Sequence, residues 1–266
     1  MQNNTNEENL KNDILQNNFK FIDLFAGIGG FRIALETFGG KCVFSSEWDK
    51  HAQITYETNF GDKPAGDITK IEEQSIPHHD VLCAGFPCQP FSISGKKLGF
   101  QDIRGTLFFD ITRIVDFHKP KVIFLENVKH FVNHDKGNTR QVVINKLKSL
   151  EYDVFDTVLN SSDFGIPQSR KRYYLIAFKK NLKIKNFVFP IPTYQKVTLK
   201  KFLQDNAKAK NQQISKGEIK IFEDMAKRIK EKKGELSPIR IGTINGGGQG
   251  ERIYSPDGHA ITISAH

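Results

Sequence analysis

Short apolar runs alternate with amphipathic segments through the first 180 residues, and this alternation constrains the fold more than any other feature. Compact apolar runs are typical of buried strands, whereas apolar residues spaced three or four apart are typical of helices. Their regular succession predicts an α/β fold with a doubly wound, mostly parallel sheet. Strands are predicted near residues 21–25, 41–46, 80–85, 121–126, 152–159 and 172–178, and helices near residues 31–38, 49–59, 106–118 and 138–150.

The pattern changes after about residue 180, where Pro190 and Pro192 indicate a domain boundary. Residues 196–240 carry most of the chain's net charge of +9, and such a run fits either a solvated helical surface or contacts to an anionic partner. A glycine-rich run follows. Beyond it, two short apolar segments at 252–254 and 260–263 predict the strands of a hairpin.

Composition excludes several classes of protein. No apolar run approaches the roughly 20 residues that a membrane helix needs. The first 18 residues are rich in Asn and Gln and include acidic residues, which is typical of neither a secretory signal nor a transit peptide. Three cysteines are too few for a disulfide framework and favour a cytoplasmic location. No cysteine or histidine spacing predicts a metal site.

A glycine-rich segment, Asp23-Leu-Phe-Ala-Gly-Ile-Gly-Gly30, joins the first predicted strand to the first predicted helix. Glycines there let the backbone turn sharply and let a ligand approach the helix N-terminus. A full dinucleotide-binding pattern needs a further glycine where this chain has Arg32. The segment alone therefore fits either a ligand loop or simple packing of a strand against a helix.

Acidic and aromatic residues follow the second predicted strand. Glu47 lies about 20 residues beyond the first glycine of the loop, a spacing that suits an acid binding ribose hydroxyls. Trp48, the single tryptophan, fits either stacking on an adenine or core packing. Asp67 with Ile68 fits either contact with an adenine edge or, for the aspartate, the cap of a helix.

Cys88 stands in a loop after the third predicted strand, in the segment Gly85-Phe-Pro-Cys-Gln-Pro-Phe-Ser92. Pro87 and Pro90 forbid regular structure around this cysteine and hold it at the carboxyl end of the strand. A cysteine so placed is a candidate nucleophile, provided that its thiolate is stabilised. Cys42 and Cys83 lie in predicted strands, where a cysteine is usually a small buried hydrophobe.

Two further motifs carry charged side chains at strand ends. Glu126, at the end of the fourth predicted strand, fits either a proton donor with a raised pKa or a capping or ion-paired residue. Arg170 and Arg172 alternate with Lys171, so their side chains are expected to share one face of a strand. Two guanidinium groups suit a base carbonyl, a phosphate or a carboxylate, but also the protection of an edge strand.

These motifs, in this order, resemble those of the DNA cytosine-C5 methyltransferases. The resemblance runs from about residue 21 to the last residue and rests on DLFAGIGG, EWD, GFPCQPFS, ENV and QSRKR. The segments SISGKKLGFQDIRGTLFFDI and GGGQGERIYS are similar to the Hha-type, GCGC-specific bacterial modification enzymes within that family. The resemblance implies a Rossmann-like methyltransferase sheet, with an N-terminal extension over residues 1–19, a catalytic cofactor-binding domain over residues 20–190 and a small, incomplete target-recognition domain over residues 191–266.

The resemblance also implies roles for individual residues. Cys88 would be the nucleophile, with Glu126 and Arg172 at the N3 and O2 sides of cytosine and Arg170 supporting the Cys88 loop. The target cytosine would have to be flipped out of the duplex. The cofactor would be S-adenosylmethionine, bound by Phe25, Gly27, Gly29, Glu47, Trp48, Asp67, Ile68 and Pro87. Double-stranded DNA would be contacted by Gln89, Ser92, Ser94, Gln249, Gly250 and Arg252.

The chain departs from the family in one respect. It lacks the second half of the recognition domain, a motif resembling RxLTPRE and a final helix with a GNSV-like sequence. We therefore expect a truncated product, a fragment or one subunit of a split enzyme whose second polypeptide carries these motifs. An RNA cytosine-C5 methyltransferase and an inactive DNA- or cofactor-binding protein are the alternatives. The resemblance to the DNA cytosine-C5 methyltransferases implies a bacterial, cytoplasmic enzyme of a restriction–modification system with a cognate endonuclease.

Overall fold

A computed structural model describes residues 18–87, 107–203, 218–232, 237–245 and 251–261. The chain forms two compact units. The first unit comprises Met1–Thr157 and Tyr173–Val188, and the second comprises Val158–Arg172 and Phe189–His266.

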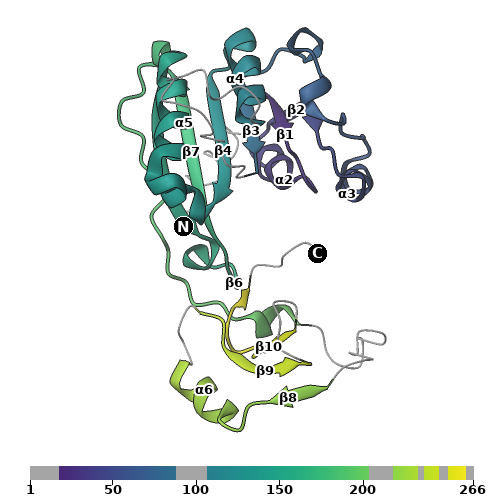
Figure 1. Ribbon diagram of the computed structural model, residues 1–266, viewed down its shortest axis with the longest axis vertical. Helices are drawn as coiled ribbons and strands as arrows, with labels where there is room; N and C mark the ends of the chain where they lie inside the picture. The colour runs from purple at the N-terminus through teal and green to yellow at the C-terminus, as the bar shows by residue number, and fades with distance from the viewer. Residues whose placement is uncertain (1–17, 88–106, 204–217, 233–236, 246–250, 262–266) are drawn as a thin grey trace, which may run out of the picture. The chain divides into compact units, whose positions relative to one another are not determined.

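The first unit is built on an α/β sheet with the strand order β2-β1-β3-β4-β7-β5 (Figure 1). β1 pairs in parallel with both β2 and β3, and β3 pairs in parallel with β4. This strand order, with helices between the parallel strands along the chain, confirms the predicted Rossmann-like α/β fold. The strands are β1 (Lys20–Leu24), β2 (Lys41–Ser46), β3 (Val81–Gly85), β4 (Val122–Val128), β5 (Tyr152–Asn160) and β7 (Lys171–Lys179), the last two of which extend across the boundary between the units.

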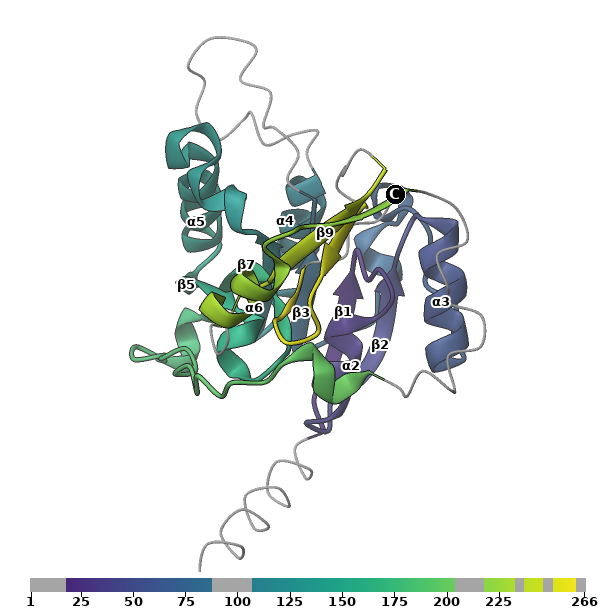
Figure 2. The ribbon, with the colours of Figure 1, turned by 90° about the horizontal axis from the view of Figure 1, so that it is seen from below.

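Helices connect these strands. Figures 1 and 2 agree in placing α3 beside the β2 edge of the sheet and α5 near β7. The helices of the described residues in this unit are α2 (Gly30–Glu36), α3 (Lys50–Phe60), α4 (Leu107–His118) and α5 (Asn138–Ser149), with short 3-10 helices at Ile68–Lys70, Glu73–Ser75, Lys129–Gly137 and Lys180–Leu182.

The core of the first unit lies between the sheet and the helices α4 and α5. Ile111 and Ile114 of α4 and Leu147 of α5 are fully buried, together with Leu82 of β3 and Leu175 of β7. By contrast, α2 has no fully buried residue. Among the described helices, α2 therefore contributes less to the core than α4 and α5 do.

The second unit holds two small sheets. An antiparallel sheet has the order β10-β9-β8, and β6 pairs in parallel with β11. Its elements are β6 (Gln168–Ser169), β8 (Ile219–Ile221), α6 (Met225–Lys232), β9 (Arg240–Ile244), β10 (Arg252–Tyr254) and β11 (Ala260–Ile261), with 3-10 helices at Ser161–Phe164 and Leu199–Phe202.

The predicted hairpin between residues 252–254 and 260–263 is wrong. β10 pairs with the preceding strand β9, and the chain then turns, with the Gly258 N–H donating to the Ser255 carbonyl. Beyond that turn the Ala260 N–H donates to the Pro167 carbonyl at 2.8 Å, so the last apolar segment pairs with β6 instead. Local alternation in the sequence indicated strands correctly but carried no information about a partner some 90 residues away.

The basic segment 196–240 is only partly helical among its described residues. α6 and one 3-10 helix lie in it, but so does the strand β8. No helix in the described part of the chain is both long and apolar enough to cross a membrane.

Candidate functional site

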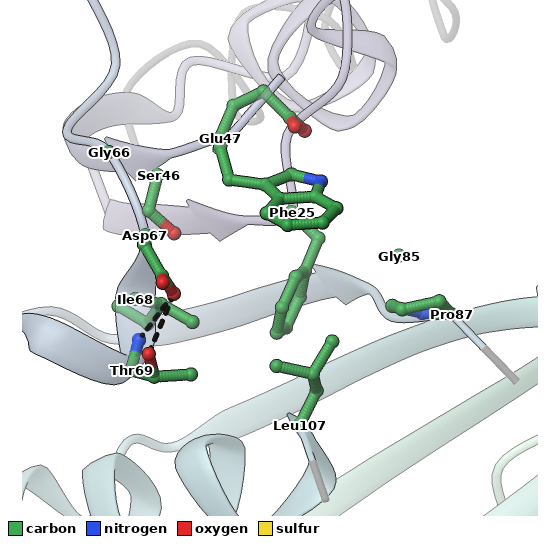
Figure 3. Close-up of a pocket in the computed structure, with 11 residues that line it drawn as sticks. Phe25, Ser46, Glu47, Gly66, Asp67, Ile68, Thr69, Gly85, Pro87 and Leu107 are labelled. Atoms are coloured by element: carbon green, nitrogen blue, oxygen red, sulfur yellow. Dashed lines mark hydrogen bonds between the residues drawn. The ribbon is translucent and has the colours of Figure 1, made fainter. Parts of the chain in front are cut away.

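A cavity of about 430 Å³ opens where β1, β2 and β3 end (Figure 3). Its volume lies in the range of small-molecule sites, about 300–1,000 Å³. The carboxyl ends of parallel strands are where ligands bind in open α/β sheets. It is lined by Phe25, Ser46, Glu47, Trp48, Gly66, Asp67, Ile68, Thr69, Gly85, Pro87 and Leu107.

The loop after β1 adopts a left-handed backbone at three positions. Phe25 has φ 56°, Gly27 has φ 55° and Gly29 has φ 95°. Glycine adopts this region without strain, whereas a phenylalanine there is uncommon and needs support from its surroundings. Gly29 is also required for space, because a Cβ at this position would lie 2.1 Å from the Phe60 ring. The glycines thus let the loop turn tightly from β1 into α2 and pass close to Phe60 at the end of α3.

The Glu47 carboxylate joins this loop to the end of β2. Its Oε2 accepts the Gly27 N–H at 2.8 Å, and its Oε1 accepts the Asp49 N–H at 2.8 Å. The residue is only 9% exposed. Each carboxylate oxygen retains a further lone pair, which suits the hydroxyl donors of a ribose. Gly27 therefore acts on the pocket through Glu47, although neither Gly27 nor Gly29 lines the cavity itself.

Trp48 and Asp67 lie on the same pocket. Trp48 is 77% exposed, so the alternative that it is a core residue is wrong. Asp67 lines the pocket and also caps the 3-10 helix Ile68–Lys70, so its two readings are compatible. Hydrogen bonds from the Thr69 hydroxyl and N–H hold the pKa of Asp67 below its ordinary value. Six of the eight expected cofactor residues thus line one cavity.

Glu126 stands beside the pocket, on β4. It is paired in register with Gly85 of β3, and a Cβ on Gly85 would lie 3.7 Å from Glu126 Oε2. The neighbouring Asn127 is buried and donates from Nδ2 to the Phe86 carbonyl at 2.9 Å. β4 is therefore tied to the root of the Cys88 loop by a side chain that sequence reasoning did not single out.

The three arginines expected at the site belong to the second unit. Arg170 lies between β6 and β7, and its carbonyl accepts the Ser161 N–H at 3.2 Å. Arg172 is the second residue of β7, and its Nη1 donates a hydrogen bond to the carbonyl of Lys171, the first residue of the strand. Arg252 is exposed on β10, opposite Thr243 of β9.

The remaining expected residues, Cys88, Gln89, Ser92, Ser94, Gln249 and Gly250, lie outside the described residues. Pro87, which precedes Cys88 in the chain, lines the pocket. Of the other cysteines, Cys83 is buried in β3 and Cys42 is half-buried in β2.

Arg32 takes a structural role in place of the missing third glycine. Its guanidinium pairs with Glu36 at 2.8 Å and Asp62 at 2.6 Å and lies over the Phe60 ring, 4.4 Å from the centroid. The side chain therefore ties α2 to the end of α3 and to the residues just after it.

Asp23 is a buried carboxyl beneath the glycine loop. The residue is fully buried on β1, between Ser45 of β2 and Cys83 of β3. Burial raises its pKa well above the ordinary value for a carboxyl, although the Arg32 N–H and the Arg32 charge act in the opposite direction. Sequence reasoning included Asp23 in the loop motif but gave it no role, because the sequence does not show that its side chain is excluded from water.

Comparison with known proteins places these features in a family context. The family model for the C-5 cytosine-specific DNA methylases matches residues 19–257 of this chain. The type II methyltransferase M.HhaI of Haemophilus parahaemolyticus is 52% identical over 247 residues, which are 93% of this chain and 74% of the relative. The type II methyltransferase M.HaeII of Haemophilus aegyptius is 52% identical over 76% of this chain and 63% of its own length.

Solved structures of similar fold include a DNMT2 variant of Spodoptera frugiperda, with a TM-score of 0.58 and 28% identity over 71% of this chain and 60% of that chain. A putative DNA modification methyltransferase from an Escherichia coli prophage has a TM-score of 0.56 and 26% identity over 68% of this chain and 53% of that chain. The chain therefore spans less than two thirds of most of these relatives.

We expect Glu47→Gln to weaken binding of an adenosyl ligand. The amide nitrogen of glutamine cannot accept either backbone N–H, so one donor loses its partner at a cost of about 1–3 kcal/mol. Calorimetric titration with S-adenosylhomocysteine measures the loss. Glu57→Gln, on the exposed face of α3, is the matched control and should bind as the wild type does. Equal affinities for the Glu47 variant and the wild type would contradict this role.

Asp23→Asn is expected to flatten the dependence of stability on pH. Because its folded pKa is raised, the folded protein retains a proton that the unfolded chain releases above about pH 4. The free energy of unfolding therefore falls as pH rises through that window, by up to about 1.4 kcal/mol per pH unit. Urea unfolding between about pH 5 and 7 compares the slopes, with Asp116→Asn on α4 as an exposed control. Parallel slopes for wild type and Asp23→Asn would show that Asp23 is not the source.

Proposed function

Because the chain belongs to the C-5 cytosine-specific DNA methylase family, we propose that it methylates C5 of cytosine in double-stranded DNA. The family and its fold are those of S-adenosylmethionine-dependent methyltransferases. The observation that carries the proposal is the pocket where β1, β2 and β3 end. It combines a fixed carboxylate, an exposed tryptophan and the proline that precedes Cys88.

The described residues fit an adenosyl cofactor. Glu47 would accept hydrogen bonds from the ribose hydroxyls. Trp48 and Phe25 would pack their aromatic faces against the adenine, and Asp67 with Ile68 would contact its polar edge. Gly27 and Gly29 keep the loop close to the ligand without side chains in the way. When bound, S-adenosylmethionine supplies an electrophilic methyl group.

The chain's own residues make cytosine reactive. The Cys88 thiolate adds to C6, which raises electron density at C5 and makes it nucleophilic. Glu126 binds at N3 and Arg172 at O2, where charge develops, and Arg170 supports the Cys88 loop. C5 would take the methyl group that bound S-adenosylmethionine supplies, leaving S-adenosylhomocysteine. A base then removes the C5 proton, and the bond between C6 and Cys88 breaks to return the thiolate.

The reacting atoms are inaccessible in a duplex, so the cytosine is flipped out of the stack. Gln249 and Ser94 are polar and suited to filling the gap left by the flipped cytosine and satisfying the guanine left unpaired. Gln89, Ser92 and Gly250 contact the DNA as well, and the glycine run lets the backbone approach base edges. Residues 196–240 add phosphate contacts that position the protein without specifying sequence.

We propose GCGC, methylated at the inner cytosine, as the target. Arg252 supports a guanine-containing site because arginine binds guanine O6 and N7 in a bidentate manner, and its side chain is exposed on β10. The 52% identity to M.HhaI and the likeness of GGGQGERIYS to Hha-type enzymes support the choice of GCGC.

A second polypeptide is proposed to complete the enzyme. On β4, Ile123 and Leu125 are buried on one face, whereas Phe124 on the opposite face is only half-buried. On α2, Ile33 is 58% exposed although it is apolar. Apolar side chains left open to solvent in this way suit a face that another segment covers. Full turnover by the purified chain alone would contradict this part of the proposal.

The relatives' designation as type II methyltransferases supports a place in a bacterial restriction–modification system. We propose a cytoplasmic location and a cognate endonuclease that cuts the same sequence when it is unmethylated.

Cys88 is expected to form a covalent adduct with cytosine. A duplex with 5-fluorocytosine at the target should trap the protein in the presence of cofactor, because fluorine does not leave as a proton does. Denaturing gel electrophoresis detects the adduct, with the complementary polypeptide added if the chain alone is inactive. Cys88→Ser should abolish trapping and Cys42→Ser should preserve it. Trapping that survives Cys88→Ser would reject the nucleophile, and trapping on RNA but not DNA would favour the RNA methyltransferase alternative.

Bisulfite sequencing of DNA modified by the complete enzyme is expected to show methylation at the inner cytosine of GCGC. Arg252→Ala should cost about 1–3 kcal/mol at the contacted guanine and relax specificity there. Lys230→Ala, on the exposed side of α6, should weaken binding to all sequences alike. Methylation centred on another sequence would reject GCGC while leaving the reaction type intact.

A further inference from the structure

We propose that Thr69 is a positioning residue, which orients the Asp67 carboxylate so that the pocket selects a purine with an amino group at position 6. This inference rests on the proposed function, since it takes an adenosyl cofactor as the ligand. Thr69 is not part of any motif identified in the sequence.

The geometry of the pair makes the carboxylate asymmetric. Asp67 Oδ1 accepts both the Thr69 hydroxyl at 2.8 Å and the Thr69 N–H at 3.1 Å, as the dashed lines of Figure 3 show. Within the described part of the chain, Oδ2 is assigned no hydrogen bond. Its nearest cation is Lys70 Nζ at 3.9 Å, on a side chain that is 81% exposed. Two donors thus occupy one oxygen and leave the other to a ligand.

This asymmetry has a chemical consequence. Asp67 is about one third exposed and lines the cavity, so its second oxygen is accessible to a bound molecule. An ionised carboxylate only accepts hydrogen bonds, and it therefore favours a donor such as the 6-amino group of adenine. Hypoxanthine presents a carbonyl oxygen at the same place, which is repelled. The discrimination depends on the carboxylate holding its orientation, and Thr69 supplies that restraint.

Both contacts come from a single residue, but only one can be removed by substitution. The backbone N–H remains in every variant, whereas Thr69→Val removes the hydroxyl and keeps the β-branched shape. Without the hydroxyl, Asp67 keeps one restraint on Oδ1 instead of two and turns more freely. A purely structural role would weaken all ligands alike, while an orienting role changes the ratio between them.

The test measures calorimetric affinities for S-adenosylhomocysteine and S-inosylhomocysteine, which differ only at position 6. The wild type should bind the adenosyl ligand at least about tenfold more tightly. Thr69→Val should bind it about fivefold more weakly, as expected for one lost hydrogen bond, and should lose most of the preference. Thr69→Ser, which keeps the hydroxyl, should retain both affinity and preference.

Thr58→Val is the matched control, because the Thr58 hydroxyl also makes one local hydrogen bond, to the Ile54 carbonyl on α3. It should leave both affinities unchanged. If Thr69→Val does not fold, Thr69→Ala serves in its place with the same expectation. An unchanged preference in the folded variant would overturn the role of Thr69 and leave the proposed function standing. A wild type that binds neither ligand even with the complementary polypeptide present would overturn the proposed function, and this inference with it.

Discussion

The pocket depends on the Glu47 carboxylate, which is held by backbone N–H groups on both sides. Gly27 belongs to the loop after β1 and Asp49 to the start of α3, so one side chain connects two crossovers of the sheet. Because the residue is nearly buried, these hydrogen bonds compete little with water. The tight glycine loop, with Gly29 against Phe60, places the Gly27 N–H where the carboxylate can reach it. Ligand recognition and local folding therefore use the same group.

The sequence predicted the fold well because its signals are local. Apolar runs located the parallel strands, as at 121–126 against the observed Val122–Val128 of β4. The glycine loop predicted the turn between Leu24 and α2, and the position of Glu47 after the second strand placed it on the pocket. Long-range pairing was not predictable in the same way, and the end of the chain, expected to form a hairpin, pairs with β6 instead.

The site was predictable where a residue type is unusual for its position. The single tryptophan and an acid at the end of a predicted strand stand out in the sequence, and both line the pocket. Thr69 and Asn127 do not stand out, because a threonine or an asparagine hydrogen-bonds in many settings. These residues are recognised only in the folded structure, where Thr69 hydrogen-bonds back to Asp67 and Asn127 donates to the Phe86 carbonyl. Arg32 was informative in the negative sense, because it argued against a dinucleotide site.

The pairing of β6 with β11 sets the order in which the two units can form during synthesis. The sheet of the first unit is complete once β7 has been made, at Lys179. The second unit includes Gln168 and Ser169, but their strand partners are Ala260 and Ile261, which are translated some 90 residues later. Closing so long a loop is entropically costly and slow. The first unit can therefore fold on the ribosome while β6, in the segment between β5 and β7, remains without its strand partner until β11 has been made.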